Sequence, residues 1–317
     1  MDEISEKKEA LGAVLTKQFH ESCLKFMREE RKLKPKTQLL YGKVLEGIFK
    51  NSILTQKIYS RYFNKGNYFK AVLRMMEKAA AYYDIPFYSY KSVRQRPHPR
   101  KNPQYWSEEE ILNLIGSMQK INRLQALMMK MAYFCGAGLR FSSVLFIQWS
   151  DFNWKEWAQN PSKAGRINIT VAKGGKQAVL PVDKRFMAEL YEIARIDKAI
   201  AQQVPYNPEF FPGENYFFKD DELKEFEKLY DKETAQVFWT MKKWNQINYN
   251  LKKVSKSNLN RKFKFHSLRH SRAIVLLQKG MSLLDINKLL MHTNLETTRI
   301  YLNLTDQEVQ DKFDRLT

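Results

Sequence analysis

The segment H-S-L-R-H at residues 266–270 sets two histidines beside one arginine on a single predicted helix. It is followed by L-L-M-H at residues 289–292 and by R-I-Y, which ends at Tyr301. Upstream, G-A-G-L-R ends at Arg140 and supplies a second arginine. The pattern predicts that histidines and arginines from separate segments gather around one tyrosine.

Arginine, histidine and tyrosine are the side chains that a metal-free transesterification at phosphorus needs. Guanidinium groups stabilise charge on a phosphate, and a phenol can attack phosphorus. Tyr301 taken alone would be interpreted as a half-buried helix aromatic, because tyrosine commonly packs in that way. Together with its neighbours, it predicts a nucleic-acid backbone as the substrate.

The charge balance points to the same class of partner. The chain has 54 Lys and Arg residues against 34 Asp and Glu residues, which gives a net charge of +20. Such a charge repels itself unless a polyanion neutralises it, so we expect nucleic acid as a partner. No stretch of about 18 apolar residues occurs, and the N-terminus lacks the apolar run of a signal peptide. We therefore expect an intracellular protein without a membrane partner.

The two cysteines, Cys23 and Cys135, lie far apart in the sequence and within apolar helical patterns. Buried cysteine behaves as a small apolar side chain, and disulfides are rare inside cells. We therefore expect two buried free thiols and neither a disulfide nor a metal site.

A segment without helical period, residues 85–103, is rich in proline, lysine and arginine. Such a composition predicts a linker, and its basic residues suit either a strap across a phosphate backbone or a solvated connection. The predicted division is an N-terminal domain at residues 1–90, a basic linker at 91–105 and a C-terminal domain at 106–317.

The first domain shows only helical periodicity, for example at Val72, Met75, Met76 and Ala79. This predicts a compact bundle of about four helices. Its basic faces suit DNA binding, but no residue pattern in it indicates which bases are read.

The second domain begins with Ser107, a predicted helix cap before three glutamates. A further helix ends at Gly136 and Gly138, where a glycine turn can aim Arg140 away from the core. Alternating residues at 167–171 and the run at 178–182 predict two strands joined by a hairpin turn. We therefore expect a mainly α domain with one small antiparallel β-sheet.

Five blocks in this order resemble the tyrosine recombinase, or phage integrase, family. They span most of residues 106–305, and they are G-L-R at 138–140, A-K-G-G-K at 172–176, H-S-L-R-H-S at 266–271, L-L-M-H at 289–292, and Tyr301. The resemblance implies the tyrosine recombinase fold, with an N-terminal SAM-like core-binding bundle before the catalytic domain. It also implies a site-specific DNA recombinase that needs no metal ion or other cofactor.

The resemblance implies roles for individual residues. Tyr301 matches the nucleophile, which forms a 3′-phosphotyrosyl bond and releases a 5′-hydroxyl. Arg140 and Arg269 match the two arginines that bind the nonbridging phosphate oxygens, and His292 matches a histidine that hydrogen-bonds the phosphate. His266 matches the general base or proton shuttle.

Lys173 matches the lysine that protonates the leaving oxygen, and Lys176 is a rival three residues away. The motif gives His270 no reacting role, so we assign it a packing or supporting role. His266 and His270 have the i, i+4 spacing of zinc-binding helices, but the residues between them offer no general base. We therefore expect no metal ligand, although a zinc nuclease using these two residues and His292 is an alternative to test.

Two positions depart from the family pattern. The family usually has an acidic residue three positions after the first arginine, where this chain has Ser143. It usually has glycine before the second histidine, where this chain has Met291. Neither change removes a reacting group, so we expect activity, with a DNA-binding protein that has a vestigial site as the alternative.

Other expectations concern assembly and biological role. Residues 242–264 hold eight basic residues and no acid, which predicts either a solvated face or a DNA-backbone surface. Residues 306–317 could form a short helix that docks on a neighbouring subunit, since the family often works as a tetramer on DNA. We expect an integrase of a mobile element in the prokaryotic cytoplasm, associated with the nucleoid. A Xer-like dimer resolvase and a hairpin-forming resolvase are alternatives with the same chemistry.

Overall fold

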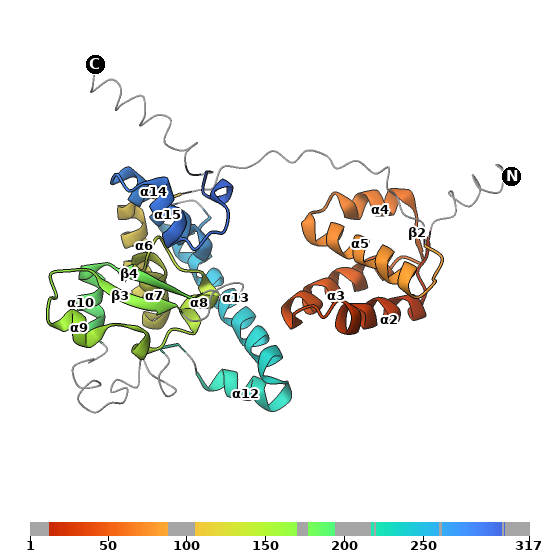
Figure 1. The fold of residues 1–317 in the computed structure, drawn as a ribbon, viewed down its shortest axis with the longest axis horizontal. Helices are drawn as coiled ribbons and strands as arrows, with labels where there is room; N and C mark the ends of the chain where they lie inside the picture. Colours follow the sequence, from red (N-terminus) through yellow and green to blue (C-terminus); the bar gives the residue numbers. More distant parts are fainter. Residues whose placement is uncertain are drawn as a thin grey trace, which may run out of the picture. The chain divides into compact units, whose positions relative to one another are not determined.

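The computed structural model divides the chain into two compact units, residues 1–100 and 101–317, which are described separately (Figure 1). The described residues are 13–87, 105–169, 177–193, 217–218, 220–259, 262–299 and 301. The basic linker predicted at 91–105 therefore lies almost wholly outside the described residues. The same is true of Lys173, Lys176 and residues 306–317.

The N-terminal unit is a helical bundle, as predicted. Its described helices are α2 (Lys17–Lys25), which continues as the π-helical turn η1 (Phe26–Glu30), α3 (Pro35–Phe49), α4 (Gln56–Phe63) and α5 (Asn67–Tyr82). Local sequence explains where they start. Thr16 accepts a hydrogen bond from the Phe19 amide at 3.1 Å, and Pro35 opens α3.

Apolar faces of all four α-helices meet in one core, which contains fully buried side chains such as Leu45 and Met76. Cys23 is part of this core, and Cys135 is buried in the other unit. Both thiols are free, as predicted.

The bundle also contains two short strands that the sequence did not indicate. β1 (Ala13–Val14) pairs antiparallel with β2 (Ile53–Leu54). A strand of two residues is too short to show an alternating pattern, so its pairing depends on the tertiary contact alone.

The C-terminal unit is mainly α with one small antiparallel sheet, which confirms the predicted fold class. Its described elements are α6 (Glu108–Ile121), α7 (Arg123–Phe134), α8 (Phe141–Leu145), η2 (Trp149–Asp151), α9 (Trp154–Ala158), β3 (Gly165–Ile169), β4 (Ala178–Val182), α10 (Lys184–Ile193), α12 (Asp221–Leu229), α13 (Lys232–Leu259), α14 (Phe265–Gln278), α15 (Leu283–Leu289) and η3 (Leu295–Thr297). None of the helices in the described part of the chain combines the length and apolar character that a membrane span needs.

The start of α6 and the sheet follow the sequence prediction. Ser107 and Glu110 form a reciprocal capping box at the N-terminus of α6. In the sheet, Ile167 pairs with Leu180, and both side chains are buried on the inner face.

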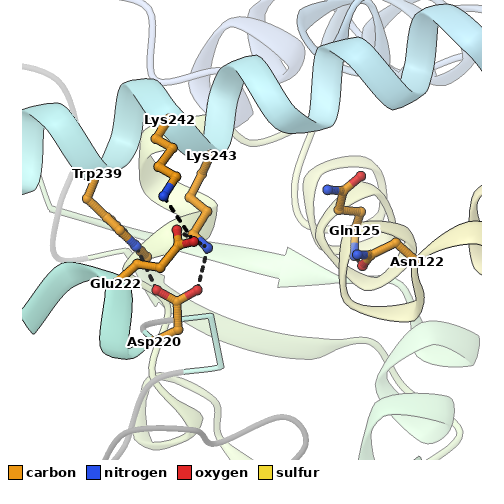
Figure 2. A network of polar contacts seen from close by, with 7 residues as sticks. All are labelled: Asn122, Gln125, Asp220, Glu222, Trp239, Lys242 and Lys243. Atoms are coloured by element: carbon orange, nitrogen blue, oxygen red, sulfur yellow. Dashed lines mark hydrogen bonds and ion pairs between the residues drawn. The ribbon is translucent and has the colours of Figure 1, made fainter. Parts of the chain in front are cut away.

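A polar cluster joins α12 to the long helix α13 (Figure 2). Trp239 donates to Asp220 at 2.8 Å, and Lys243 forms ion pairs with Asp220 and Glu222. Lys242 lies 3.1 Å from Glu222. Two lysines of the basic run at 242–264 are therefore neutralised by Asp220, the N-cap residue of α12, and by Glu222 within that helix.

The glycine turn after α7 brings three elements together. Gly136 and Gly138 have φ of 59° and 103°, a left-handed backbone that favours glycine. The Gly136 amide donates to the Pro181 carbonyl of β4 at 2.8 Å. A Cβ added to Gly138 would lie 2.7 Å from the Arg269 Cα, so this glycine lets α14 pack against the turn.

We expect Gly138→Ala to destabilise the C-terminal unit by about 1–3 kcal/mol, because the new Cβ meets both α14 and a strained backbone. Gly116→Ala is the matched control, since Gly116 lies in α6 with open space around it. The control should stabilise the protein by about 0.5–1 kcal/mol through helix propensity. Denaturant unfolding measures both, and equal effects of the two substitutions would contradict the close packing at Gly138.

Candidate active site

Helix α14 carries the H-S-L-R-H motif. Arg269 is only 2% exposed, His270 is half-buried and His266 is exposed. Arg140 is the N-cap residue of α8, directly after the glycine turn, and is half-buried. It lies close enough to Arg269 for its positive charge to lower the pKa of that residue.

The guanidinium of Arg269 is held by backbone carbonyls. It donates to the carbonyl oxygens of Gly138 and Leu290, and its Nη2 lies 3.3 Å from Nε2 of His292. Among the described residues, no carboxylate lies within ion-pair distance of it. Burial, followed by the charge of Arg140, lowers the pKa of Arg269 to about 9. The site therefore contains a buried cation without an anionic partner in the described residues, which is costly unless an anion binds there.

His292 is oriented by a chain of hydrogen bonds from behind. Thr298 donates to the Asn287 side-chain oxygen at 2.7 Å, so its hydroxyl oxygen can accept from His292 Nδ1, 2.9 Å away. The Asn287 amide also donates to the His292 carbonyl at 3.4 Å, which defines the orientation of that amide. These contacts place the proton of neutral His292 on Nδ1 and leave Nε2 facing Arg269.

Tyr301 is 1% exposed, and its hydroxyl lies 2.9 Å from His270 Nδ1. The ring of His266 meets the ring of His270 edge-on, with their centroids 4.7 Å apart. Burial raises the pKa of Tyr301, and the charge of Arg269 lowers it to a smaller extent. The phenol therefore retains its proton at neutral pH.

Burial, and to a smaller extent the positive charge of the site, favours the neutral form of its histidines. Burial, followed by His266, Arg269 and His292, lowers the pKa of His270 to about 4. Burial, followed by Arg269, Arg140 and His266, lowers the pKa of His292 to about 4 as well. Desolvation, Arg269 and Arg140 also lower the pKa of His266.

The structure thus brings together five of the six predicted site residues, and Lys173 lies outside the described residues. The five are Arg140, His266, Arg269, His292 and Tyr301. Sequence analysis gave His270 only a packing or supporting role, whereas the structure places it in direct contact with the Tyr301 hydroxyl. Its i, i+4 spacing from His266 was the available signal.

The structure shows the surroundings of Met291 and Ser143, the two positions that depart from the family pattern. Met291 has φ of 52°, a left-handed backbone that glycine adopts without strain, which explains why the family usually has glycine there. For methionine this conformation costs roughly 1 kcal/mol. Ser143 is 3% exposed, and its amide donates to the Arg140 carbonyl at 2.9 Å. Serine at this position brings no negative charge to the two arginines.

A metal site was the remaining alternative for the histidines. In the parts of the chain that the structure describes, His, Cys, Asp and Glu side chains form no group of three that could hold a metal ion.

Comparison with known proteins identifies the family. The model of the phage integrase family matches residues 104–308. A tyrosine recombinase of Thermosipho africanus is 28% identical over 258 residues, which cover 81% of this chain and 75% of that protein. The tyrosine recombinase XerA of Pyrococcus furiosus is 24% identical, over 79% of this chain and 76% of its own length.

Solved structures show the same fold. A lambda integrase dimer bound to a COC′ core site has a TM-score of 0.59 at 14% identity, and the match covers 94% of this chain and 80% of that one. XerH recombinase bound to a palindromic difH substrate has a TM-score of 0.58 at 18% identity, with 87% and 78% covered.

The chain belongs to the phage integrase family. This confirms the family predicted from the five sequence blocks, together with the enzyme class, a tyrosine-type site-specific recombinase.

The lowered histidine pKa values predict how stability depends on pH. Between the ordinary pKa of 6.5 and the value of about 4 for His292, the unfolded chain binds a proton that the folded chain excludes. Stability should therefore fall as the pH falls through this window. In His292→Asn the side-chain amide can keep the Thr298 contact but does not titrate, so its melting temperature should fall less steeply. Parallel pH profiles of the melting temperature for the two proteins would contradict the assignment.

Proposed function

We propose that this recombinase cleaves and rejoins duplex DNA through a covalent 3′-phosphotyrosyl bond at Tyr301. One observation carries the proposal: the buried guanidinium of Arg269 has no carboxylate partner in the described residues and lies beside Arg140. A phosphodiester supplies the missing negative charge. The nucleophile is close by, because Tyr301 contacts His270, the residue after Arg269.

Arg269 and Arg140 bind the nonbridging oxygens of the scissile phosphate. A guanidinium has five N–H groups, and the described contacts of Arg269 use three of them, with Gly138, Leu290 and His292. The remaining two are free to bind the phosphate, while the carbonyl contacts hold the group rigidly in place.

His292 also contacts the phosphate, and its protonation state responds to that contact. In the DNA-free chain its Nε2 carries no proton and cannot donate to an oxygen. The negative charge of a bound phosphate offsets that of Arg269 and raises the pKa of His292, so the imidazolium form donates from Nε2.

The reaction exchanges one phosphodiester for another. The Tyr301 oxygen forms a bond to phosphorus as the bond from phosphorus to the 5′-oxygen breaks. That oxygen receives a proton from Lys173, or from its rival Lys176. The phosphotyrosine retains the energy of the original bond, so religation is the reverse reaction and needs no ATP.

The biological role that we propose is integration and excision of a mobile element in the prokaryotic cytoplasm. The altered positions Ser143 and Met291 support this, since they differ from the pattern expected of a housekeeping resolvase. The Xer-like and hairpin-forming alternatives share the chemistry and differ in the DNA joints that they make.

We further propose that the N-terminal bundle and linker bind DNA, and that residues 306–317 dock on the next protomer of a DNA-bound tetramer.

The central test uses a suicide substrate that is nicked near the cleavage site, so that religation cannot occur. Wild-type protein in excess chelator should become covalently attached to the DNA, and Tyr301→Phe should form no adduct because it lacks the attacking oxygen. Loss of Arg269 should slow adduct formation by about a hundredfold to a thousandfold. Cleavage without an adduct, or cleavage that the chelator abolishes, would refute the proposal and favour a metal-dependent nuclease.

Three lysines of the basic run on α13 are a further DNA contact in this proposal. Lys252, Lys253 and Lys256 are exposed on α13 and have no ion pair among the described residues. Lys253 lies over the ring of Tyr249, 4.6 Å from its centroid. Lys242 lies on the same helix but is paired with Glu222 (Figure 2).

Lys256→Gln should weaken DNA binding at every sequence and reduce the salt slope by about 0.9, the value for one lost phosphate contact. Lys242→Gln is the matched control, and its already neutralised charge should leave the slope nearly unchanged. Binding titrations over a salt series measure both slopes. Identical slopes for Lys256→Gln and wild type would show that this face is merely solvated.

A further inference from the structure

The hydroxyl of Tyr301 is hydrogen-bonded to a histidine to which the family motif assigned no reacting role. His270 Nδ1 lies 2.9 Å from the Tyr301 oxygen, and the two ring centroids are 5.8 Å apart. Among the described residues, His270 is the hydrogen-bond partner of that hydroxyl. Because Tyr301 is 1% exposed, bulk water has little access to it.

We propose that His270, rather than His266, accepts the proton of Tyr301 when the phenolic oxygen attacks phosphorus. The proposal rests on the proposed function, in which Tyr301 is the nucleophile. His270 contacts the reacting atom itself, so it is a catalytic residue and not only a packing residue.

A proton acceptor needs a free lone pair, and the surroundings of His270 provide one. The titratable and charged groups that face it are His266 and Arg269 on α14, His292 after α15, and Tyr301. No carboxylate contributes from the described residues. Burial, followed by His266, Arg269 and His292, lowers the pKa of His270 to about 4, so its ring is neutral before DNA binds. Tyr301 can then donate to Nδ1 while Nε2 carries the ring proton.

Arrival of the phosphate makes His270 a stronger base. The negative charge offsets the cationic neighbours and raises the pKa of the imidazole. As the bond from the Tyr301 oxygen to phosphorus forms, the phenolic proton moves to Nδ1, and Nε2 then releases its proton towards solvent. The leaving 5′-oxygen takes a separate proton from Lys173 or Lys176, as in the proposed function, so both proton transfers balance.

His266 occupies a different place in this arrangement. Its side chain is exposed, and its ring meets that of His270 at an interplanar angle of 86°. It therefore contacts both solvent and the ring of His270. This position suits the onward transfer of the proton to water and not its removal from Tyr301.

The test compares His270→Asn with His266→Asn on the nicked suicide substrate across a pH series. The asparagine amide lies near the position of Nδ1, so it can hold the Tyr301 hydroxyl but cannot take its proton. Adduct formation by His270→Asn should be slower by about a hundredfold to ten-thousandfold, the range for loss of a general base. The remaining rate of adduct formation should no longer show the change with pH that titration of His270 causes in the wild-type protein. His266→Asn should lose at least tenfold less.

Two controls keep the result interpretable. Melting temperature and affinity for uncleaved DNA should stay near the wild-type values in both variants, which separates catalysis from folding. A substrate with sulfur at the leaving 5′ position needs no proton on its leaving group, so it should rescue a lysine variant but leave His270→Asn slow.

Three results would overturn the inference: a wild-type rate for His270→Asn, a larger loss for His266→Asn, or rescue of His270→Asn by the sulfur substrate. Failure of the proposed function would look different, because wild-type protein itself would then form no adduct.

Discussion

The site depends on one constraint: the guanidinium of Arg269 is buried without a carboxylate partner in the described residues. Carbonyl oxygens of Gly138 and Leu290 satisfy part of its hydrogen-bonding capacity but do not neutralise its charge. Burying an unpaired charge is unfavourable, and a bound anion removes the penalty. The fold therefore favours binding of a phosphate at Arg269, whose side chain is already held in position. Preorganised donors of this kind stabilise the charge that develops during a reaction.

Burial and the same positive field together determine the protonation state of the other reacting groups. The field contributes to the low pKa values of His270 and His292, while burial keeps Tyr301 protonated. In the absence of DNA, the histidines are neutral and the nucleophile retains its proton. A phosphate raises the pKa of both histidines, which makes His270 a stronger proton acceptor for Tyr301, so substrate binding and activation are coupled through charge. Ser143, in place of the usual acid, leaves this field undiminished.

The sequence predicted the mainly α fold with its small sheet, because helical periodicity, the Ser107 cap and the alternation at 167–169 are local signals. It also predicted, through motif spacing, five residues that the structure brings together, whereas Lys173 stays a prediction. It could not show the contact between His270 and Tyr301, since that depends on how the segment after α15 returns to α14. Nor could it show which lysines of α13 are neutralised, because the acids that pair with Lys242 and Lys243 come from the N-cap and first turn of α12. The residue type also gave no sign of the left-handed backbone at Met291, because methionine rarely adopts that conformation.

The most direct test of the central claim is a double-mutant cycle between Arg269 and the charge of the scissile phosphate, measured as DNA affinity in a Tyr301→Phe background. One partner is Arg269→Ala, and the other is a neutral methylphosphonate at the scissile position. The account predicts that the methylphosphonate weakens binding when Arg269 is present and has little further effect when it is absent. Equal losses in both proteins would mean that Arg269 does not hold that phosphate, and would contradict the account.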